Sequence, residues 1–241
     1  MIVKNMKNLV SIIIPTLNEE KYIESTLKSL QNQDYKGKYE IIVADGMSRD
    51  DTVKIAKKYA NKVIPVRQKG IAEGRNAGAK VAKGDILFFI DADTILLFNG
   101  LTELIKPFKK KDVVGVTCPI IPISPKAKDF VIYWYLNLFL KRSVKTKKAR
   151  IPGICCIYRR SAFETVGGFA EKLDTFEDFA LSEKISKLGK IIFVDKTLVL
   201  TSHRRIQKWG EFKSIRKYLT AYVNYVIRGK VISAKEYKPV R

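Results

Sequence analysis

Acidic residues follow three apolar runs of the chain, at the points where strands would end. They are Glu19 after the run 10–14, Asp45 after 40–44, and Asp91 and Asp93 after 86–90. Carboxylates that share one edge of a protein repel one another unless a cation or a donor-rich ligand lies among them. Asp91 and Asp93, separated by Ala92, offer the hard oxygen ligands that suit Mg²⁺ or Mn²⁺, which would bridge to a diphosphate. The alternative is that each acid ends a strand in solvent or caps the next helix.

The elements that would position these acids alternate along the first half of the chain. Apolar runs of strand length are separated by segments with apolar residues at a helical period, as in 20–30 and 70–82. The run 86–90 is apolar at every position, which indicates a strand covered on both faces. Repeated strand–helix units predict an α/β fold with a mostly parallel sheet and helices on both faces. Ligands of such a sheet bind beyond the carboxyl ends of its strands, where the acids are expected.

The second half of the chain is less regular but continues with the same kinds of element. A capping-box pattern at 161–164 predicts the start of a helix. Apolar residues at a helical period after Ile206 predict a basic amphipathic helix. The other expected elements are helices at 51–60, 129–142 and 177–188, and strands at 62–66, 113–116, 154–158, 191–194 and 196–201.

The composition excludes several classes of protein. The 241 residues carry a net charge of +22, but 46% of them are hydrophobic, which is too many for a disordered polycation. The three cysteines form no CxxC pair and no Cys/His cluster, so we expect neither a zinc site nor a disulfide framework. The first nine residues lack the apolar core of a signal peptide. The longest apolar stretch, 130–140, is far shorter than the ~20 residues of a spanning helix.

Two other classes of protein fit part of this pattern. A basic nucleic-acid-binding protein would fit the pI of about 9.8, but aromatic residues are not interleaved with the basic ones and no known binding motif is present. A sugar nucleotidyltransferase also uses acids and a metal on a similar sheet, but it normally has a Gly/Arg/Lys-rich loop after the first strand. The chain has the acidic stretch 16–19 there instead. P-loop and GxGxxG phosphate motifs are absent from the sequence.

Four ordered motifs carry a resemblance to a known family. They are VSIIIPTLNEE at 10–20, IIVADGMSRDDT at 41–52, GIAEGRNAG at 70–78 and GDILFFIDAD at 84–93. Together they resemble the family 2 glycosyltransferases, which are inverting enzymes with a GT-A fold. The resemblance extends over about residues 8–205 and identifies neither the sugar nor the acceptor.

The resemblance implies a nucleoside-diphosphate sugar donor, UDP- or GDP-linked, and Mn²⁺ or Mg²⁺ as cofactor. It places Glu19 near the ribose, Asp45 at the base, and Arg75 near the phosphates. Asp93 is the implied direct metal ligand, and Asp91 and His203 are further candidates, although a lone histidine can equally be a packed imidazole. The residues implied to line the donor site are Pro15, Thr16, Glu19, Asp45, Gly70, Arg75, Asp91, Ala92, Glu177, Arg204 and Arg205.

The resemblance also implies a catalytic base. Family members carry an acidic pair at the start of a helix beyond the acceptor loop, and Glu177-Asp178 fits that pattern. We expect Asp178 to be the base, with Asp174 as a nearby competitor. The alternative is a solvated helix N-terminus at which the helix dipole favours acids. Some relatives carry a Gln where this chain has Ile95, so the third metal ligand stays open.

The basic surplus lies in the second half of the chain. Residues 121–241 hold 26 basic and 10 acidic side chains, and the aromatic stretch 129–140 is followed by six basic residues up to Arg150. This pattern favours a lipid-phosphate or glycan acceptor and an anionic membrane surface as partners, with no nucleic acid; the alternative is a helix that covers the active site. We expect a cytoplasmic protein, peripheral on the inner face of the cell membrane.

The sequence predicts two domains. Residues 1–205 would form the GT-A glycosyltransferase domain, with a nucleotide-sugar half at about 1–120 and an acceptor half at 121–205. Residues 206–241 would form a C-terminal amphipathic basic helical extension.

Overall fold

The computed structural model describes residues 9–67, 70–173, 175–204 and 220. The expected extension at 206–241 therefore lies outside the described residues, apart from residue 220. The first half contains β1 (Val10–Thr16), α1 (Ile23–Gln31), β2 (Tyr39–Asp45), α2 (Thr52–Ala56), β3 (Lys62–Pro65), α3 (Ile71–Val81), β4 (Ile86–Ile90), β5 (Thr94–Leu96), α4 (Gly100–Ile105), a 3₁₀ turn (Lys106–Lys109) and β6 (Val113–Thr117). The second half contains β7 (Ile120–Ile123), α5 (Ala127–Ser143), β8 (Cys155–Arg159), α6 (Arg160–Thr165), α7 (Glu177–Ile185), β9 (Lys190–Phe193) and β10 (Val199–Ser202).

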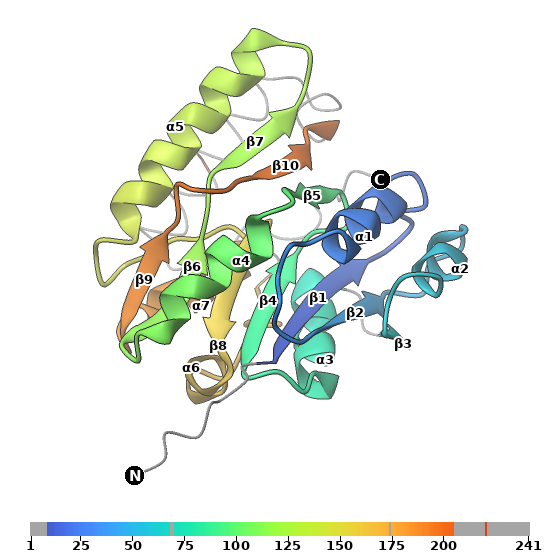
Figure 1. Cartoon of the computed structure of the whole chain (residues 1–241), viewed down its shortest axis with the longest axis horizontal. Helices are drawn as coiled ribbons and strands as arrows, with labels where there is room; N and C mark the ends of the chain where they lie inside the picture. Colours follow the sequence, from blue (N-terminus) through green and yellow to red (C-terminus); the bar gives the residue numbers. More distant parts are fainter. Residues whose placement is uncertain (1–8, 68–69, 174, 205–219, 221–241) are drawn as a thin grey trace.

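A seven-stranded sheet forms the centre of the described chain. Its strand order is β3-β2-β1-β4-β8-β6-β9, and β8 runs antiparallel to both of its neighbours (Figure 1). The pairs β1–β2, β1–β4, β2–β3 and β6–β9 are parallel. The carboxyl ends of β1, β2 and β4 therefore share one edge, and the chain enters β8 at that same edge, where Cys155 pairs with Ile90. The expected α/β fold with a mostly parallel sheet is confirmed.

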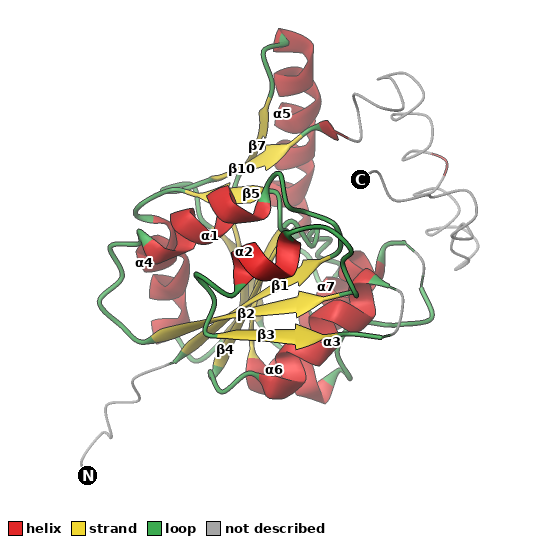
Figure 2. Ribbon diagram, turned by 90° about the vertical axis from the view of Figure 1, so that its right-hand side faces the viewer, coloured by secondary structure: helices red, strands yellow, loops and turns green. Residues whose placement is uncertain are grey.

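A second, smaller sheet has the order β5-β10-β7. It connects the segment after β4 with the second half of the chain, because β10 pairs antiparallel with β5 and parallel with β7. The helix α5 packs against β7 and projects beyond the large sheet (Figure 2). None of the helices within the described ranges is long and apolar enough to cross a bilayer.

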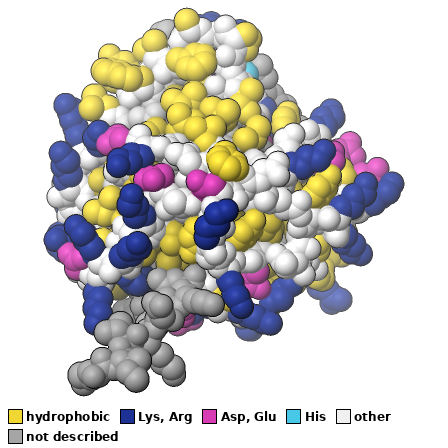
Figure 3. Space-filling view, viewed as in Figure 1, with side chains coloured by type: hydrophobic (Ala, Val, Ile, Leu, Met, Phe, Trp, Pro, Cys, Tyr) yellow, Lys and Arg dark blue, Asp and Glu magenta, His cyan; other side chains and the backbone are white. Residues whose placement is uncertain are grey.

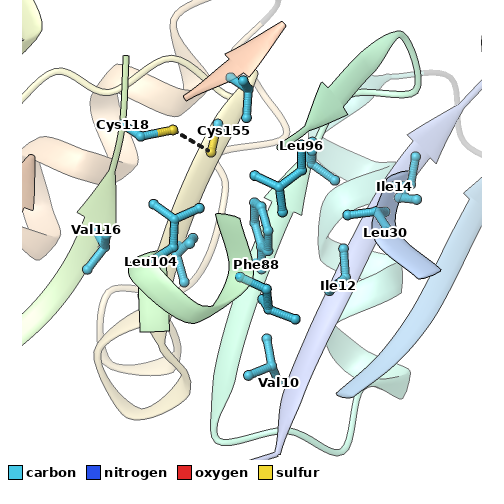
Figure 4. Close-up of a cluster of buried hydrophobic side chains, with 14 of the residues drawn as sticks. Val10, Ile12, Ile14, Leu30, Phe88, Leu96, Leu104, Val116, Cys118 and Cys155 are labelled. Carbon is cyan, nitrogen blue, oxygen red and sulfur yellow. Dashed lines mark hydrogen bonds between the residues drawn. The ribbon is translucent and has the colours of Figure 1, made fainter. Parts of the chain in front are cut away.

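Two hydrophobic cores cover the two faces of the large sheet, because successive side chains of a strand point to opposite faces. In β1, Val10, Ile12 and Ile14 pack in one core with residues of α1 and α4 (Figure 4). Ile13 packs in the other core with residues of α3, α6 and α7. Every residue of β4 is buried, as expected for a strand with helices on both faces. The cysteine thiols are also buried, and the sulfurs of Cys118 and Cys155 are 3.7 Å apart.

The helix predicted from the capping-box pattern is confirmed as α6, but Ser161 is not its cap. The helix α6 begins at Arg160, directly from β8, so Ser161 lies inside its first turn and makes no capping hydrogen bond. The chain passes from strand to helix at Arg159 without the turn that a capping serine would occupy. The short strands β5 and β7 were not expected.

The glycine in the middle of α3 allows this helix to lie close to β1. A Cβ placed on Gly78 would be 2.4 Å from Cγ2 of Ile13, which is fully buried. We expect Gly78→Ala to lower the free energy of unfolding by about 1–3 kcal/mol, because overpacking outweighs the ~1 kcal/mol by which alanine favours a helix. Urea denaturation would measure this loss. The exposed Lys80→Ala on the same helix should change stability by less than ~0.5 kcal/mol, and an equal effect of both variants would contradict the close contact.

Candidate active site

The loops after β1 and β2 are joined by hydrogen bonds around the buried Asp45. Its Oδ1 accepts the hydroxyls of Thr16 (3.2 Å) and Ser48 (2.5 Å), and its Oδ2 accepts the backbone N–H of Ser48 (2.9 Å). Pro15 lies beside Gly74 of α3, where a Cβ would be 3.2 Å from the proline Cβ. The structure thus brings Pro15, Thr16 and Asp45 to one edge of the sheet.

The carboxylates of Asp91 and Asp93 follow β4 at the same edge. Ala92 between them is buried in the core, and its carbonyl accepts the hydroxyl of Thr26 at 2.8 Å. The backbone turns here, because the N–H of Thr94 donates to the carbonyl of Asp91 at 3.2 Å. Both acids remain accessible, with side chains 24% and 11% exposed. Because Ala92 is buried, the carboxylates of Asp91 and Asp93 are held in place on either side of it, at the carboxyl end of β4.

Arg204 connects these carboxylates with the loop after β1. Its guanidinium makes a bidentate pair with Glu19, with two distances of 2.7 Å, and its Nε is 3.2 Å from Oδ2 of Asp93. It also lies 4.9 Å above the ring of Tyr22. Burial and the nearby charge of Asp91 raise the pKa of Asp93 to about 7, although Arg204 opposes the rise. An ionised Asp93 is thus favoured by an additional cation.

The donor set at this point fits a divalent metal. Within the part of the chain that the structure describes, no group of three or more His, Cys, Asp or Glu side chains is arranged to hold an ion. Mg²⁺ and Mn²⁺ do not require such a cage, because they commonly bind one or two carboxylates and take their other ligands from water and substrate phosphates. Two accessible carboxylates with a raised pKa at Asp93 meet that requirement.

A second arginine, which is buried, connects the acids after β4 with the start of α7. Arg75 of α3 has a side chain only 2% exposed, and its guanidinium pairs with Asp91 at 3.0 Å and with Glu177 at 2.7 Å. The ring of Phe169 lies 5.1 Å from the guanidinium carbon. The family resemblance implies a place for Arg75 near the donor phosphates, whereas in the structure two carboxylates hold its guanidinium.

Asp178, the candidate base, lies next to Glu177 at the start of α7. Its Oδ2 accepts the backbone N–H of Gly153 at 2.6 Å, and its Oδ1 accepts that of Phe179 at 2.7 Å. Burial raises the pKa of Asp178, and Arg75 limits the rise. Burial and Asp178 raise the pKa of Glu177 to about 7, again against the effect of Arg75. The two acids differ in access, because Glu177 is buried whereas Asp178 is partly exposed.

Gly153 and Phe169 contribute to this arrangement and were not predicted as site residues. A Cβ on Gly153 would be 1.9 Å from Nη2 of Arg75, so only glycine fits between the guanidinium and Asp178. Gly153 directly precedes the strand expected at 154–158, and this was the only indication in the sequence. Nothing in the sequence pattern distinguishes Phe169 from other core aromatics.

The remaining predicted site residues are not brought into these contacts. Gly70 lies exposed at the N-terminus of α3. His203 is buried, and its Nε2 faces Asp129 of α5 at 3.7 Å, so its role as a metal ligand stays a prediction. Arg205 and Asp174 lie outside the described residues.

Known structures share this fold over most of the chain. Staphylococcus aureus TarS 1–349 in complex with UDP-GlcNAc matches with a TM-score of 0.67 and 23% identity, over 81% of this chain and 58% of that chain. The mannosyltransferase PcManGT from Pyrobaculum calidifontis, in complex with GDP-Man and Mn²⁺, matches with a TM-score of 0.71 and 23% identity, over 92% and 65%. The fold is therefore that of the GT-A glycosyltransferases.

The sequence comparison gives the family. The model of glycosyl transferase family 2 matches residues 11–167, and the chain belongs to this family. The probable glycosyltransferase YdaM of Bacillus subtilis is 30% identical over 207 residues, which are 77% of this chain and 49% of YdaM. TarS, a poly(ribitol-phosphate) beta-N-acetylglucosaminyltransferase, is 39% identical over 90 residues, which are 34% of this chain and 16% of TarS. The chain thus spans about half of YdaM and a small part of TarS.

The pairing of Arg75 predicts a pH-dependent loss of stability in Arg75→Met. Without the guanidinium, Asp91 and Glu177 lose their shared partner, and removal of one partner of a buried pair costs about 3–5 kcal/mol. The pKa of Glu177, already above its ordinary 4.5, should rise further, so the variant loses more stability as the pH rises. Urea denaturation should show a larger deficit at pH 8 than at pH 5.

The exposed Arg67→Met is the control for this measurement, with little expected change at either pH. A deficit of Arg75→Met that is the same at both pH values would mean that lost packing, and not unpaired carboxylates, causes the loss.

Proposed function

We propose that this family 2 glycosyltransferase moves a sugar from a UDP- or GDP-linked donor to an acceptor, with inversion at the anomeric carbon. The supporting observation is one network at the carboxyl edge of the sheet. In it, Arg75 pairs with Asp91, on the proposed donor side, and with Glu177, which precedes the candidate base Asp178. The catalytic domain in this proposal is 1–205. TarS with UDP-GlcNAc and PcManGT with GDP-Man and Mn²⁺ provide the precedent for such donors.

The donor would lie along the edge from β2 to β4. Asp45 would accept a hydrogen bond from the base, and Glu19 would face the ribose, next to Pro15 and Thr16. Asp93, with Asp91, would hold Mn²⁺ or Mg²⁺, which when bound supplies positive charge to the donor diphosphate. Arg204 already lies between Glu19 and Asp93 and would place its guanidinium close to the same phosphates.

Asp178 would act on the acceptor. A hydroxyl oxygen attacks the anomeric carbon from the face opposite the diphosphate, and its proton passes to a carboxylate oxygen of Asp178. The bond between the anomeric carbon and the diphosphate oxygen breaks, and its electron pair leaves with the diphosphate. Burial, which raises the pKa of Asp178, strengthens this carboxylate as a proton acceptor. If the acceptor is a phosphate, no base is needed, and Asp178 would orient it.

The acceptor is inferred to be anionic, a lipid phosphate or a membrane-associated glycan. The surplus of positive charge in residues 121–241, with 26 basic against 10 acidic side chains, would attract such an acceptor. TarS, which acts on poly(ribitol-phosphate), is a relative with an anionic acceptor. The site of action proposed is the cytoplasmic face of the cell membrane, with the protein bound peripherally.

Donor binding tests the metal site directly. We expect UDP or GDP to raise the melting temperature of the protein by about 5 °C at saturation, and to do so only with Mn²⁺ or Mg²⁺. Asp93→Asn should lose the metal-dependent part of this shift. The exposed Asp112→Asn is the control and should keep it. If neither nucleotide changes the melting temperature of the wild type, the proposed donor class is wrong.

The base assignment separates catalysis from binding. Asp178→Asn should lower sugar transfer to a hydroxyl acceptor by about 10²–10⁴-fold, because the amide cannot accept the proton. Its affinity for the donor nucleotide, measured by calorimetry, should stay within about twofold of wild type, which is ~0.4 kcal/mol, because the proposal has Asp178 act on the acceptor and not on the donor. Glu183→Gln on the same helix should leave both unchanged. Loss of nucleotide affinity in Asp178→Asn would assign this residue to the donor site instead.

A further inference from the structure

One face of α5 exposes large apolar side chains to solvent. Val131, Trp134 and Tyr135 are 53%, 59% and 62% exposed. The rings of Trp134 and Tyr135 lie edge to face, with their centroids 4.9 Å apart. Tyr133 and Leu140, on the opposite face, pack in the core. Hydrophobic side chains gather over α5 and β7 in Figure 3, and Figure 2 shows that α5 projects from the rest of the described chain. An exposed patch of this kind marks a site of interaction.

Positive charge borders this patch at both ends of α5. The segment 113–163 contains a single acidic residue, Asp129, and that side chain is buried. Lys141 pairs with Asp195, which neutralises one of the cations. The exposed basic residues around the patch are Lys126 and Lys128 at the start of α5, and Lys141, Arg142, Lys145, Lys147 and Lys148 at its end.

The charge decides which partner fits the patch. A second copy would place the same basic residues against each other in a symmetric interface, which is repulsive. The chain's own residues 205–241 are also basic, with ten Lys and Arg against two Glu. A soluble polyanion would satisfy the cations but leave Trp134 and Tyr135 in water. An anionic bilayer provides phosphates for the cations and an apolar boundary for the rings.

We propose that α5 docks the protein on an anionic phospholipid surface. Trp134 and Tyr135 enter the boundary between headgroups and acyl chains, and the cations at the two ends of α5 lie among the headgroup phosphates. This inference specifies the surface through which the proposed peripheral association occurs. It concerns binding alone and can be tested without sugar transfer.

Sedimentation with lipid vesicles tests the docking surface. The full-length protein should bind vesicles of phosphatidylcholine with phosphatidylglycerol, and bind pure phosphatidylcholine much more weakly. The double variant Trp134→Ala/Tyr135→Ala should lower the affinity for anionic vesicles at least tenfold. The double variant Arg142→Gln/Lys145→Gln should lower it about 25-fold, because each cation near the surface contributes ~fivefold. The control Lys109→Gln/Lys110→Gln removes two exposed charges outside α5 and should bind as the wild type does. Circular dichroism and the Mn²⁺-dependent nucleotide shift would confirm that each variant is folded.

Fluorescence gives an independent measure of insertion. The chain has two tryptophans, Trp134 and Trp209, so Trp209→Phe leaves Trp134 as the single tryptophan. Its emission should shift to the blue on anionic vesicles and be quenched by lipids brominated in the upper part of the acyl chains.

Three results would overturn the proposal. In the first, the wild type does not bind anionic vesicles, or both α5 variants bind them as well as the wild type does. In the second, vesicle binding depends on the cations but not on the two rings, which would mean electrostatic adsorption without insertion of Trp134 and Tyr135 into the bilayer. In the third, the patch mediates self-association that Trp134→Ala/Tyr135→Ala abolishes. Each would leave the proposed sugar transfer untouched, because donor binding is measured separately.

Discussion

The active-site edge depends on the pairing of one buried guanidinium with two carboxylates. Arg75 brings together three elements, since it lies on α3, Asp91 follows β4, and Glu177 begins α7. A charged side chain that is 2% exposed is tolerated only when partners replace its hydration, and both carboxylates do so within 3.0 Å. Because Arg75 contacts Gly153 as well, its position also determines where the backbone N–H that holds Asp178 lies. The positions of Asp91, Glu177 and Asp178 are therefore not independent of one another.

This arrangement brings several carboxylates close together, and the raised pKa values of Asp93 and Glu177 show that their ionised forms are destabilised. Both Asp93 and Glu177 have a pKa raised to about 7, in each case mainly by burial and then by a neighbouring carboxylate. Two arginines reduce the repulsion without removing it, Arg204 at Asp93 and Arg75 at Glu177. Because the ionised acids of this site are destabilised, a cation that binds among them is stabilised by their charge. Shifted pKa values of this kind cluster at functional sites.

The sequence predicted those parts of the fold that depend on local pattern. The strand 86–90 and the helix expected at 70–82 agree with β4 and α3 because their apolar periods extend over whole elements. The strands β5 and β7 pair only through β10, which lies far along the chain, so no local pattern marks them as strands. The acids after β1, β2 and β4 were predictable from strand ends. The contact of Arg75 with Glu177 was not, because it joins residues 102 positions apart whose proximity requires the folded sheet.

The distribution of charge also bears on how one protein could bind the two anionic partners proposed for it, a nucleoside-diphosphate donor and a phospholipid surface. The net charge of +22 attracts both at long range, but salt screens it beyond about 10 Å, so local charge decides the final contacts. At the edge proposed for the donor, the local charges are those of Glu19, Asp91 and Asp93, which would repel a diphosphate unless a divalent cation is present. Around α5 they are lysine and arginine, which need no such cation. The proposed donor and the proposed phospholipid surface would therefore differ in metal dependence, which lets each be recognised at its own place on the protein.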